Sequence, residues 1–171
     1  MTDQHADRIR GAASIFKDAY EALVAALEGM DDTSAARLAP DGGWSPAQVA
    51  WHVAESNRLT AATLSGALPG ARRADGFVED PALFSRIPER AETLIPALNP
   101  PAGVTRDDAL TKLRWSAAPT LKAIETLTPD RAANYTVKLP FGVLNLYQLA
   151  EFAAEHVGRH QKQLERCLET V

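Results

Sequence analysis

Three of the four histidines in this chain have a spacing that suits metal binding. His156 and His160 lie one helical turn apart in the segment EHVGRHQKQ, so a helix places both imidazoles on one face. His52 lies in a second helical segment, WSPAQVAWH, on the same side as apolar residues. A histidine pair of this kind supplies two metal ligands, and a third must come from another helix. The three side chains could therefore bind one divalent metal ion.

The same histidines could instead be core residues with ordinary hydrogen-bond partners. A histidine pair on an apolar helix face is, taken alone, more often of this second kind. A buried neutral imidazole nevertheless needs a partner for each ring nitrogen, and an unmet polar group costs about 1–3 kcal/mol. The predicted helices contain few polar side chains for this purpose: Tyr20, Ser56, Thr60, Gln148 and Gln163. The residues themselves leave both interpretations open, although a metal would satisfy all three imidazoles together.

Other titratable residues have weaker claims to a role in this site. Glu55 follows His52 by three residues; it could be a fourth ligand, an acceptor for an imidazole N–H or, most commonly, a solvated carboxylate. Cys167 lies almost two turns beyond His160 and is predicted to be a small core residue. His5 lies near the start of the chain and is left out of the site.

Two further groups could contact a substrate. Arg72 and Arg73 lie in the segment GARRADG and could present cations to an anionic ligand, although such a loop is usually only solvated. Aromatic side chains could line a pocket, although packing is the default role for each of them: Trp51, Trp115, Tyr135, Phe141 and Tyr147. The sequence assigns no catalytic residue and no cofactor-binding residue.

Four segments with helical periodicity must position these side chains. They cover residues 7–29, 46–66, 105–127 and 145 to near the C-terminus. The second begins most clearly, because Ser45 and Gln48 match a capping box and Pro46 lies at the first helical position. Similar start signals mark two other helices: Thr105 with Asp108, and Asn145 with Gln148.

The connections between these helices indicate the topology. Short links join the first helix to the second and the third to the fourth, so each pair is expected to be antiparallel. The long segment 68–104 can cross the bundle, and a short helix is expected within it around 81–95. Pro119 is expected to bend the third helix, and the only extended stretch is expected near 135–143. The prediction is an all-α protein, a single-domain four-helix bundle over residues 1–171 with a long crossover between the second and third helices.

Composition limits the class of protein. Lys and Arg number 18 against 22 Asp and Glu, and both signs are scattered, so no basic stripe for nucleic acid is evident. The single cysteine, Cys167, cannot form an internal disulfide, as expected in a reducing cytoplasm. The first residues lack the apolar core of a signal peptide, and no stretch is long and apolar enough for a membrane span. We therefore expect a soluble cytoplasmic protein that acts on a small molecule.

Two segments resemble the DinB-like superfamily. GWSPAQVAWHVAES is similar to its second-helix signature, and LPFGVLNLYQLAEFAAEHVGRHQKQLERC is similar to its last helix, with a His-x-x-x-His pair. The resemblance extends over essentially the whole chain in helix order and spacing. In that family three histidines bind a divalent metal, usually zinc or nickel, and His52, His156 and His160 match them. A related branch that includes mycothiol-dependent isomerases has glutamate at the first position of the last-helix pair, where this chain has His156.

The resemblance also narrows the expected chemistry. Three neutral ligands leave an open coordination position, and the metal would acidify a thiol or a water that fills it. Relatives of the family include bacillithiol and mycothiol S-transferases, and other members are described as metal-dependent hydrolases. We favour metal-dependent transfer of a low-molecular-weight thiol; hydrolysis of a small amide or ester and a non-catalytic, stress-associated role in metal binding remain open. The family also implies a homodimer.

Overall fold

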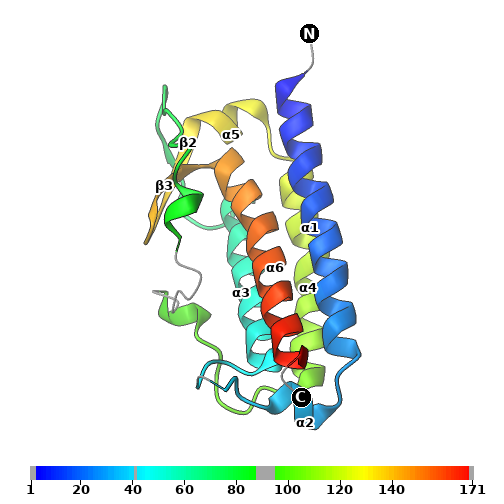
Figure 1. Cartoon of the computed structure of the whole chain (residues 1–171). Helices are drawn as coiled ribbons and strands as arrows, with labels where there is room; N and C mark the ends of the chain where they lie inside the picture. The colour runs from blue at the N-terminus through cyan, green and yellow to red at the C-terminus, as the bar shows by residue number, and fades with distance from the viewer. Residues whose placement is uncertain (1–2, 41, 88–94, 170–171) are drawn as a thin grey trace.

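Four long helices form the body of the molecule (Figure 1). The computed structural model describes residues 3–40, 42–87 and 95–169. The long helices are α1 (Gln4–Glu28), α3 (Pro46–Ser65), α4 (Arg106–Glu125) and α6 (Leu146–Glu169). In the view of Figure 1, α1 and α6 run down the bundle, and α3 and α4 run up it. The predicted four-helix bundle is confirmed, because α1 and α3 are antiparallel, α4 and α6 are antiparallel, and a long crossover between α3 and α4 lets these two run parallel.

Local sequence explains where the two histidine-bearing helices begin. At α3, the Gln48 backbone N–H donates to Ser45 Oγ at 3.3 Å, and the Ser45 N–H donates to Gln48 Oε1 at 3.0 Å. At α6, the Gln148 N–H donates to Asn145 Oδ1 at 2.9 Å, and the Asn145 N–H donates back to Gln148 Oε1 at 3.3 Å. Both are capping boxes, which satisfy backbone donors that have no partner within the helix. The predicted starts of α3 and α6 are therefore confirmed.

Short helical elements that periodicity did not predict lie between the long helices. They are α2 (Asp32–Ala36), α5 (Pro129–Asn134) and two 3₁₀ turns, η1 (Phe84–Arg86) and η2 (Pro96–Leu98). Side chains of Asp31 and Thr128 cap α2 and α5, so the polar runs that end α1 and α4 also start new turns. The short helix expected around 81–95 is only the single turn η1 within 81–87, and residues 88–94 lie outside the described residues.

A small antiparallel sheet lies at the upper end of the bundle in Figure 1. β2 (Tyr135–Leu139) and β3 (Gly142–Asn145) form a hairpin where one extended stretch was expected, near 135–143. β1 (Arg72–Arg73), from the crossover, pairs with β2 to give the strand order β1-β2-β3. The expectation of only one extended stretch is therefore wrong, because the crossover contributes a strand of its own.

The core between the helices is mainly aliphatic. α3 packs most extensively on α4, and α1 on α6. The largest fully buried side chains are Phe16, Leu23, Leu27, Val49, Val53, Leu64, Leu113, Ile124, Leu144, Leu146, Val157 and Leu164. A core of this size stabilises a chain of 171 residues without a structural metal, so changes at a metal site should leave the bundle folded.

Two further expectations concern single helices. α4 continues across Pro119, whose side chain is exposed, and the bend expected there stays a prediction. None of the helices in the described part of the chain is both long and apolar enough to cross a membrane.

Candidate metal centre

The three histidines singled out from the sequence meet between α3 and α6. His52 comes from α3, and His156 and His160 lie one turn apart on α6. The Nε2 atom of His156 is 3.2 Å from Nε2 of His52 and 3.1 Å from Nε2 of His160. Nitrogen ligands about 2.0–2.1 Å from a tetrahedral zinc lie ~3.4 Å apart, so these separations are close to those of a metal site. The predicted convergence of the three side chains is therefore present in the fold.

The other ring nitrogens determine which atoms face the centre. Nδ1 of His52 lies 2.9 Å from the carbonyl oxygen of Leu98 in η2, and Nδ1 of His160 lies 2.8 Å from Gln163 Oε1. Both oxygens can only accept, so each Nδ1 of a neutral ring carries the proton and each Nε2 keeps its lone pair. Partners of this kind hold metal-ligating histidines in the correct tautomer.

This arrangement fits a cation better than it fits hydrogen bonding alone. Two Nε2 lone pairs, from His52 and His160, both face Nε2 of His156. His156 can donate only one proton from that atom, so at least one of the two lone pairs lacks a well-aligned hydrogen-bond donor. A divalent ion would accept all three lone pairs, and the residues present therefore fit a metal.

Burial keeps the three imidazoles neutral. It lowers the pKa of His52, although the hydrogen bond to Leu98 opposes the shift. It also lowers the pKa of His160 to about 4, with a further contribution from His52, and holds the pKa of His156 well below its usual value, with His160, His52 and Arg159 adding to the effect. Neutral imidazole is the form that binds a metal, so the site is prepared for ligation at neutral pH.

Comparison with known proteins identifies the family of this chain. A family model described as the DinB superfamily matches residues 15–164. The chain belongs to the DinB superfamily. The matched region contains His52, His156 and His160, so the whole candidate centre of this DinB protein lies within the family domain. Searches of curated proteins and of solved structures gave no significant match.

The titratable candidates outside the histidine trio do not join it. Glu55 pairs with Arg58 at 2.9 Å and with Lys112 at 2.8 Å, and it therefore links α3 to α4 as an ion-paired carboxylate. Burial raises the pKa of Glu55, but its hydrogen bonds to Lys112 and Arg58 outweigh this and lower it. Among the described residues, the cluster contains histidine alone, without Asp, Glu or Cys. His5 donates to or accepts from the Tyr147 hydroxyl at 2.7 Å and is not part of the cluster.

The remaining polar and cationic candidates have other roles in this DinB protein. Of the polar side chains named from the sequence, Gln163 contacts a site histidine, whereas Gln148 caps α6. Ser56 Oγ is buried without a hydrogen-bond partner among the described residues. Arg73 pairs with Asp75 and Asp130, and it therefore stabilises the β1 region rather than standing ready for an anion.

Of the aromatic residues expected to line a pocket, Phe141 packs against Phe152 beside the centre, with ring centroids 5.1 Å apart, and the others lie elsewhere. Trp115 is 80% exposed, and Trp51, Tyr135 and Tyr147 lie beside cationic side chains elsewhere. The rings that do approach the histidines are Trp44, 4.9 Å from His52, and Phe152, 5.3 Å from His156. Phe152 was missed although it precedes His156 by four residues, a spacing that places both on one helix face.

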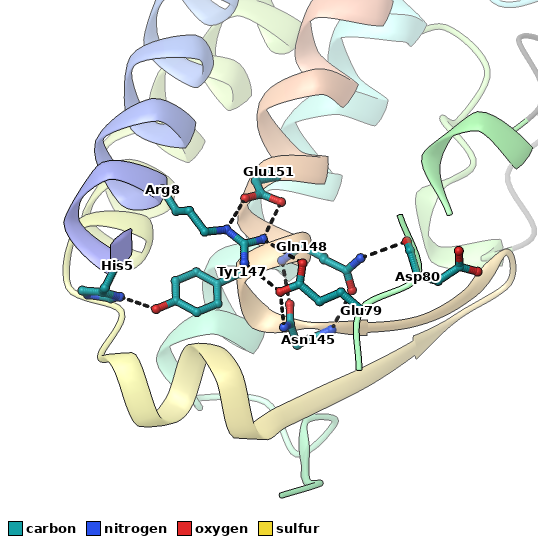
Figure 2. Close-up of polar contacts among 8 residues, drawn as sticks. All are labelled: His5, Arg8, Glu79, Asp80, Asn145, Tyr147, Gln148 and Glu151. Carbon is teal, nitrogen blue, oxygen red and sulfur yellow. Dashed lines mark hydrogen bonds and ion pairs between the residues drawn. The ribbon is translucent and has the colours of Figure 1, made fainter. Parts of the chain in front are cut away.

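A polar network holds the crossover against the end of the bundle (Figure 2). Arg8 of α1 donates to both carboxylate oxygens of Glu79 at 2.7 and 3.1 Å, and to both of Glu151 at 2.7 and 2.9 Å. Asn145 Nδ2 donates to Glu79 at 2.7 Å, and Gln148 Nε2 donates to the Asp80 carbonyl at 3.4 Å. We call Arg8, Glu79 and Glu151 the arginine clamp; it joins α1, the crossover and α6 at the end of the bundle where α6 begins.

Proposed function

We propose that this DinB protein binds one divalent metal ion, zinc or nickel, through the Nε2 atoms of His52, His156 and His160. The observation that supports the proposal most strongly is the orientation of the rings. His52 donates from Nδ1 to Leu98, and His160 donates from Nδ1 to Gln163. The Nε2 lone pairs of these two rings are therefore directed at Nε2 of His156, which lies within 3.2 Å of both. Three protein ligands leave a coordination position for a substrate, as in catalytic zinc sites.

We further propose that the bound metal serves transfer of a low-molecular-weight thiol. A divalent ion with three neutral ligands would lower the pKa of a thiol in its open position and make the sulfur a nucleophile at neutral pH. In the transfer, the thiol proton passes to solvent, the sulfur lone pair forms a new bond to carbon, and the leaving group departs with its bonding pair. The chain contributes neutral, oriented imidazoles, and the aromatic rings of Trp44 and Phe152 lie beside them.

The surroundings of the centre favour thiol transfer over hydrolysis. Hydrolysis of an amide or ester normally uses a general acid or base beside the metal to handle the proton of water and of the leaving group. The cluster contains no carboxylate among the described residues, and the nearby Glu55 is engaged by Arg58 and Lys112. A thiol transfer needs no carboxylate in the cluster, because the thiol proton can leave to solvent before the sulfur attacks.

Metal binding is tested first. Protein purified without an affinity tag is analysed for metals and titrated with zinc and nickel by calorimetry, for the wild type, His160→Ala and the control His5→Ala. We expect about one ion per chain. His160→Ala should lower the metal affinity by more than ~10–100-fold, which is the usual cost of changing a residue that only supports a ligand. His5→Ala should bind as the wild type does, because His5 contacts Tyr147 instead. Equal binding by wild type and His160→Ala would refute the site.

Turnover is tested next with the zinc-loaded protein. A panel of low-molecular-weight thiols is assayed against a model electrophile such as monochlorobimane, with His160→Ala as the matched negative control. We expect one thiol to give a rate that depends on both metal and His160. Metal binding without turnover of any thiol, together with metal-dependent cleavage of an ester or amide, would favour the hydrolase instead.

A further inference from the structure

Three phenylalanine rings form a continuous apolar surface beside the candidate metal centre. Phe152 of α6 has its ring centroid 5.3 Å from that of His156, 5.1 Å from Phe141 and 6.3 Å from Phe84. These spacings are those of favourable offset aromatic pairs. We call Phe84, Phe141 and Phe152 the phenylalanine wall; its three members come from the crossover, the β2–β3 turn and α6.

The phenylalanine wall is not part of the closed core. The largest core side chains are less than 2% exposed, whereas all three wall residues keep part of their surface open to solvent. A partly exposed set of aromatic rings next to a catalytic centre is the usual composition of a small-molecule subsite. No member of the wall is charged, so this surface itself suits an uncharged group.

The fold holds this surface in place from the crossover side. Leu83, next to Phe84, is 2% exposed, and its Cδ1 lies 2.4 Å from the position that a Cβ on Gly142 would take. Leu83 therefore packs directly over the Gly142 backbone, where any side chain would displace it. The arginine clamp and the bond from Gln148 to Asp80 fix the chain four to five residues before Phe84 (Figure 2). The crossover also reaches the centre at its other end, where the Leu98 carbonyl accepts from His52.

From this arrangement we propose that the phenylalanine wall is a subsite for an aryl group of the substrate, which stacks on Phe152 while the reacting atom lies at the metal centre. The inference rests on the proposed metal site and adds the chemical class of the substrate: a neutral aromatic compound. The ring centroids of His156 and Phe152 are 5.3 Å apart, so the wall begins directly beside the centre.

The test compares two metal-binding probes that differ only in the group beside the chelating atoms: acetohydroxamate and benzohydroxamate. Their dissociation constants are measured on zinc-loaded wild type, Phe152→Leu, Phe84→Leu and the control Trp115→Leu, which removes an exposed aromatic ring from α4. Wild type should bind benzohydroxamate at least about tenfold more tightly than acetohydroxamate, because benzohydroxamate has an additional ring that can stack and bury apolar area. Phe152→Leu should reduce this preference severalfold and leave the affinities for zinc and acetohydroxamate unchanged. Trp115→Leu should keep the full preference.

The outcomes separate this inference from the proposed function. Zinc and acetohydroxamate binding without any preference for the aryl probe would overturn the subsite and leave the metal site standing. A preference that survives in both Phe152→Leu and Phe84→Leu would place the aryl group elsewhere and also overturn it. If Phe152→Leu does not fold, Phe84→Leu at the edge of the wall decides the question. Failure of wild type to bind zinc would refute the metal site and the subsite with it.

Discussion

Removal of the Arg8 side chain from the arginine clamp should destabilise the fold measurably. In Arg8→Met the aliphatic part of the side chain is largely kept, but four hydrogen bonds to Glu79 and Glu151 are lost. The side chains of Arg8, Glu79 and Glu151 are 24%, 35% and 31% exposed, so each pair lies between a screened surface pair and a buried one. We take about 1 kcal/mol for each pair, near the upper limit for exposed pairs, and add a smaller amount for the two partly buried carboxylates that lose Arg8 as a partner. The expected loss is about 2–3 kcal/mol.

The matched control for Arg8→Met is Arg10→Met on the same helix. Arg10 is 72% exposed, and its one ion pair within the described residues is with Asp7 of the same helix, so its loss should cost less than ~0.5 kcal/mol. Urea denaturation and calorimetry at neutral pH measure both variants. For a chain of this size the expected loss for Arg8→Met corresponds to a fall in Tm of roughly 5–10 °C. Equal stability of the two variants would show that the clamp is only a set of screened surface contacts.

The pH dependence of the clamp gives a second check on the same reasoning. Burial raises the pKa of Glu79, but hydrogen bonds from Arg8 and Asn145 outweigh it, and the folded pKa lies below the usual value. The unfolded chain therefore binds more protons than the folded chain in the range just below the ordinary glutamate pKa of about 4.3. The extra stability of wild type over Arg8→Met should be fully present above that range and should decline as pH falls through the folded pKa. If the difference in unfolding free energy between wild type and Arg8→Met did not change between pH 7 and pH 3, this account would be contradicted.

Two other variants and conditions test the packing and the site. Gly142→Ala should destabilise the fold by about 1–3 kcal/mol, because the new Cβ would lie 2.4 Å from Leu83 Cδ1. Gly11→Ala in α1, where a Cβ would have nothing within 4 Å, should instead stabilise it by about 0.5–1 kcal/mol. Thermal denaturation compares the two variants, and equal effects would contradict the packing of Leu83 on Gly142. The metal-free protein should lose stability as pH falls from about 6.5 toward 4, because the site histidines stay neutral in the folded chain but bind protons in the unfolded chain. The expected loss in free energy of unfolding is up to ~1.4 kcal/mol per pH unit for each histidine. Urea denaturation with a chelator should therefore show a weaker pH dependence for His160→Gln than for wild type, and an unchanged one would be contrary evidence.

The sequence was sufficient for features that depend on near neighbours in the chain. Capping pairs such as Ser45 with Gln48 are three residues apart, so the starts of α3 and α6 could be predicted from the residues alone. The helical period then placed His52, His156 and His160 on inward faces, and the fold brings them together. Glu55 has none of the three roles considered from the sequence. Its side chain is only 13% exposed and pairs with Arg58 and Lys112, and Lys112 lies 57 residues away in the chain.

Features that join distant segments could not be predicted in this way. β1 is two exposed arginines with no alternating pattern, and it is a strand only because Tyr135 and Thr136 pair with it. The partner of His52 Nδ1 is a backbone carbonyl 46 residues away, and every residue type has such a carbonyl. Phe84 likewise approaches Phe152 only because the crossover folds back over α6. These contacts could not be predicted from the periodicity of the sequence.

The crossover is therefore the element on which function in this DinB protein should depend most. The helices supply three imidazoles, but the crossover supplies the acceptor that sets the tautomer of His52 and one ring of the phenylalanine wall. Its path is fixed at three points: by pairing of β1 with β2, by the arginine clamp, and by Leu83 over Gly142. Changes that loosen these contacts should alter substrate preference before they alter metal affinity, because His156 and His160 are held by α6 itself. A relative with the same histidines and a different crossover would then be expected to bind the same metal and to accept a different substrate.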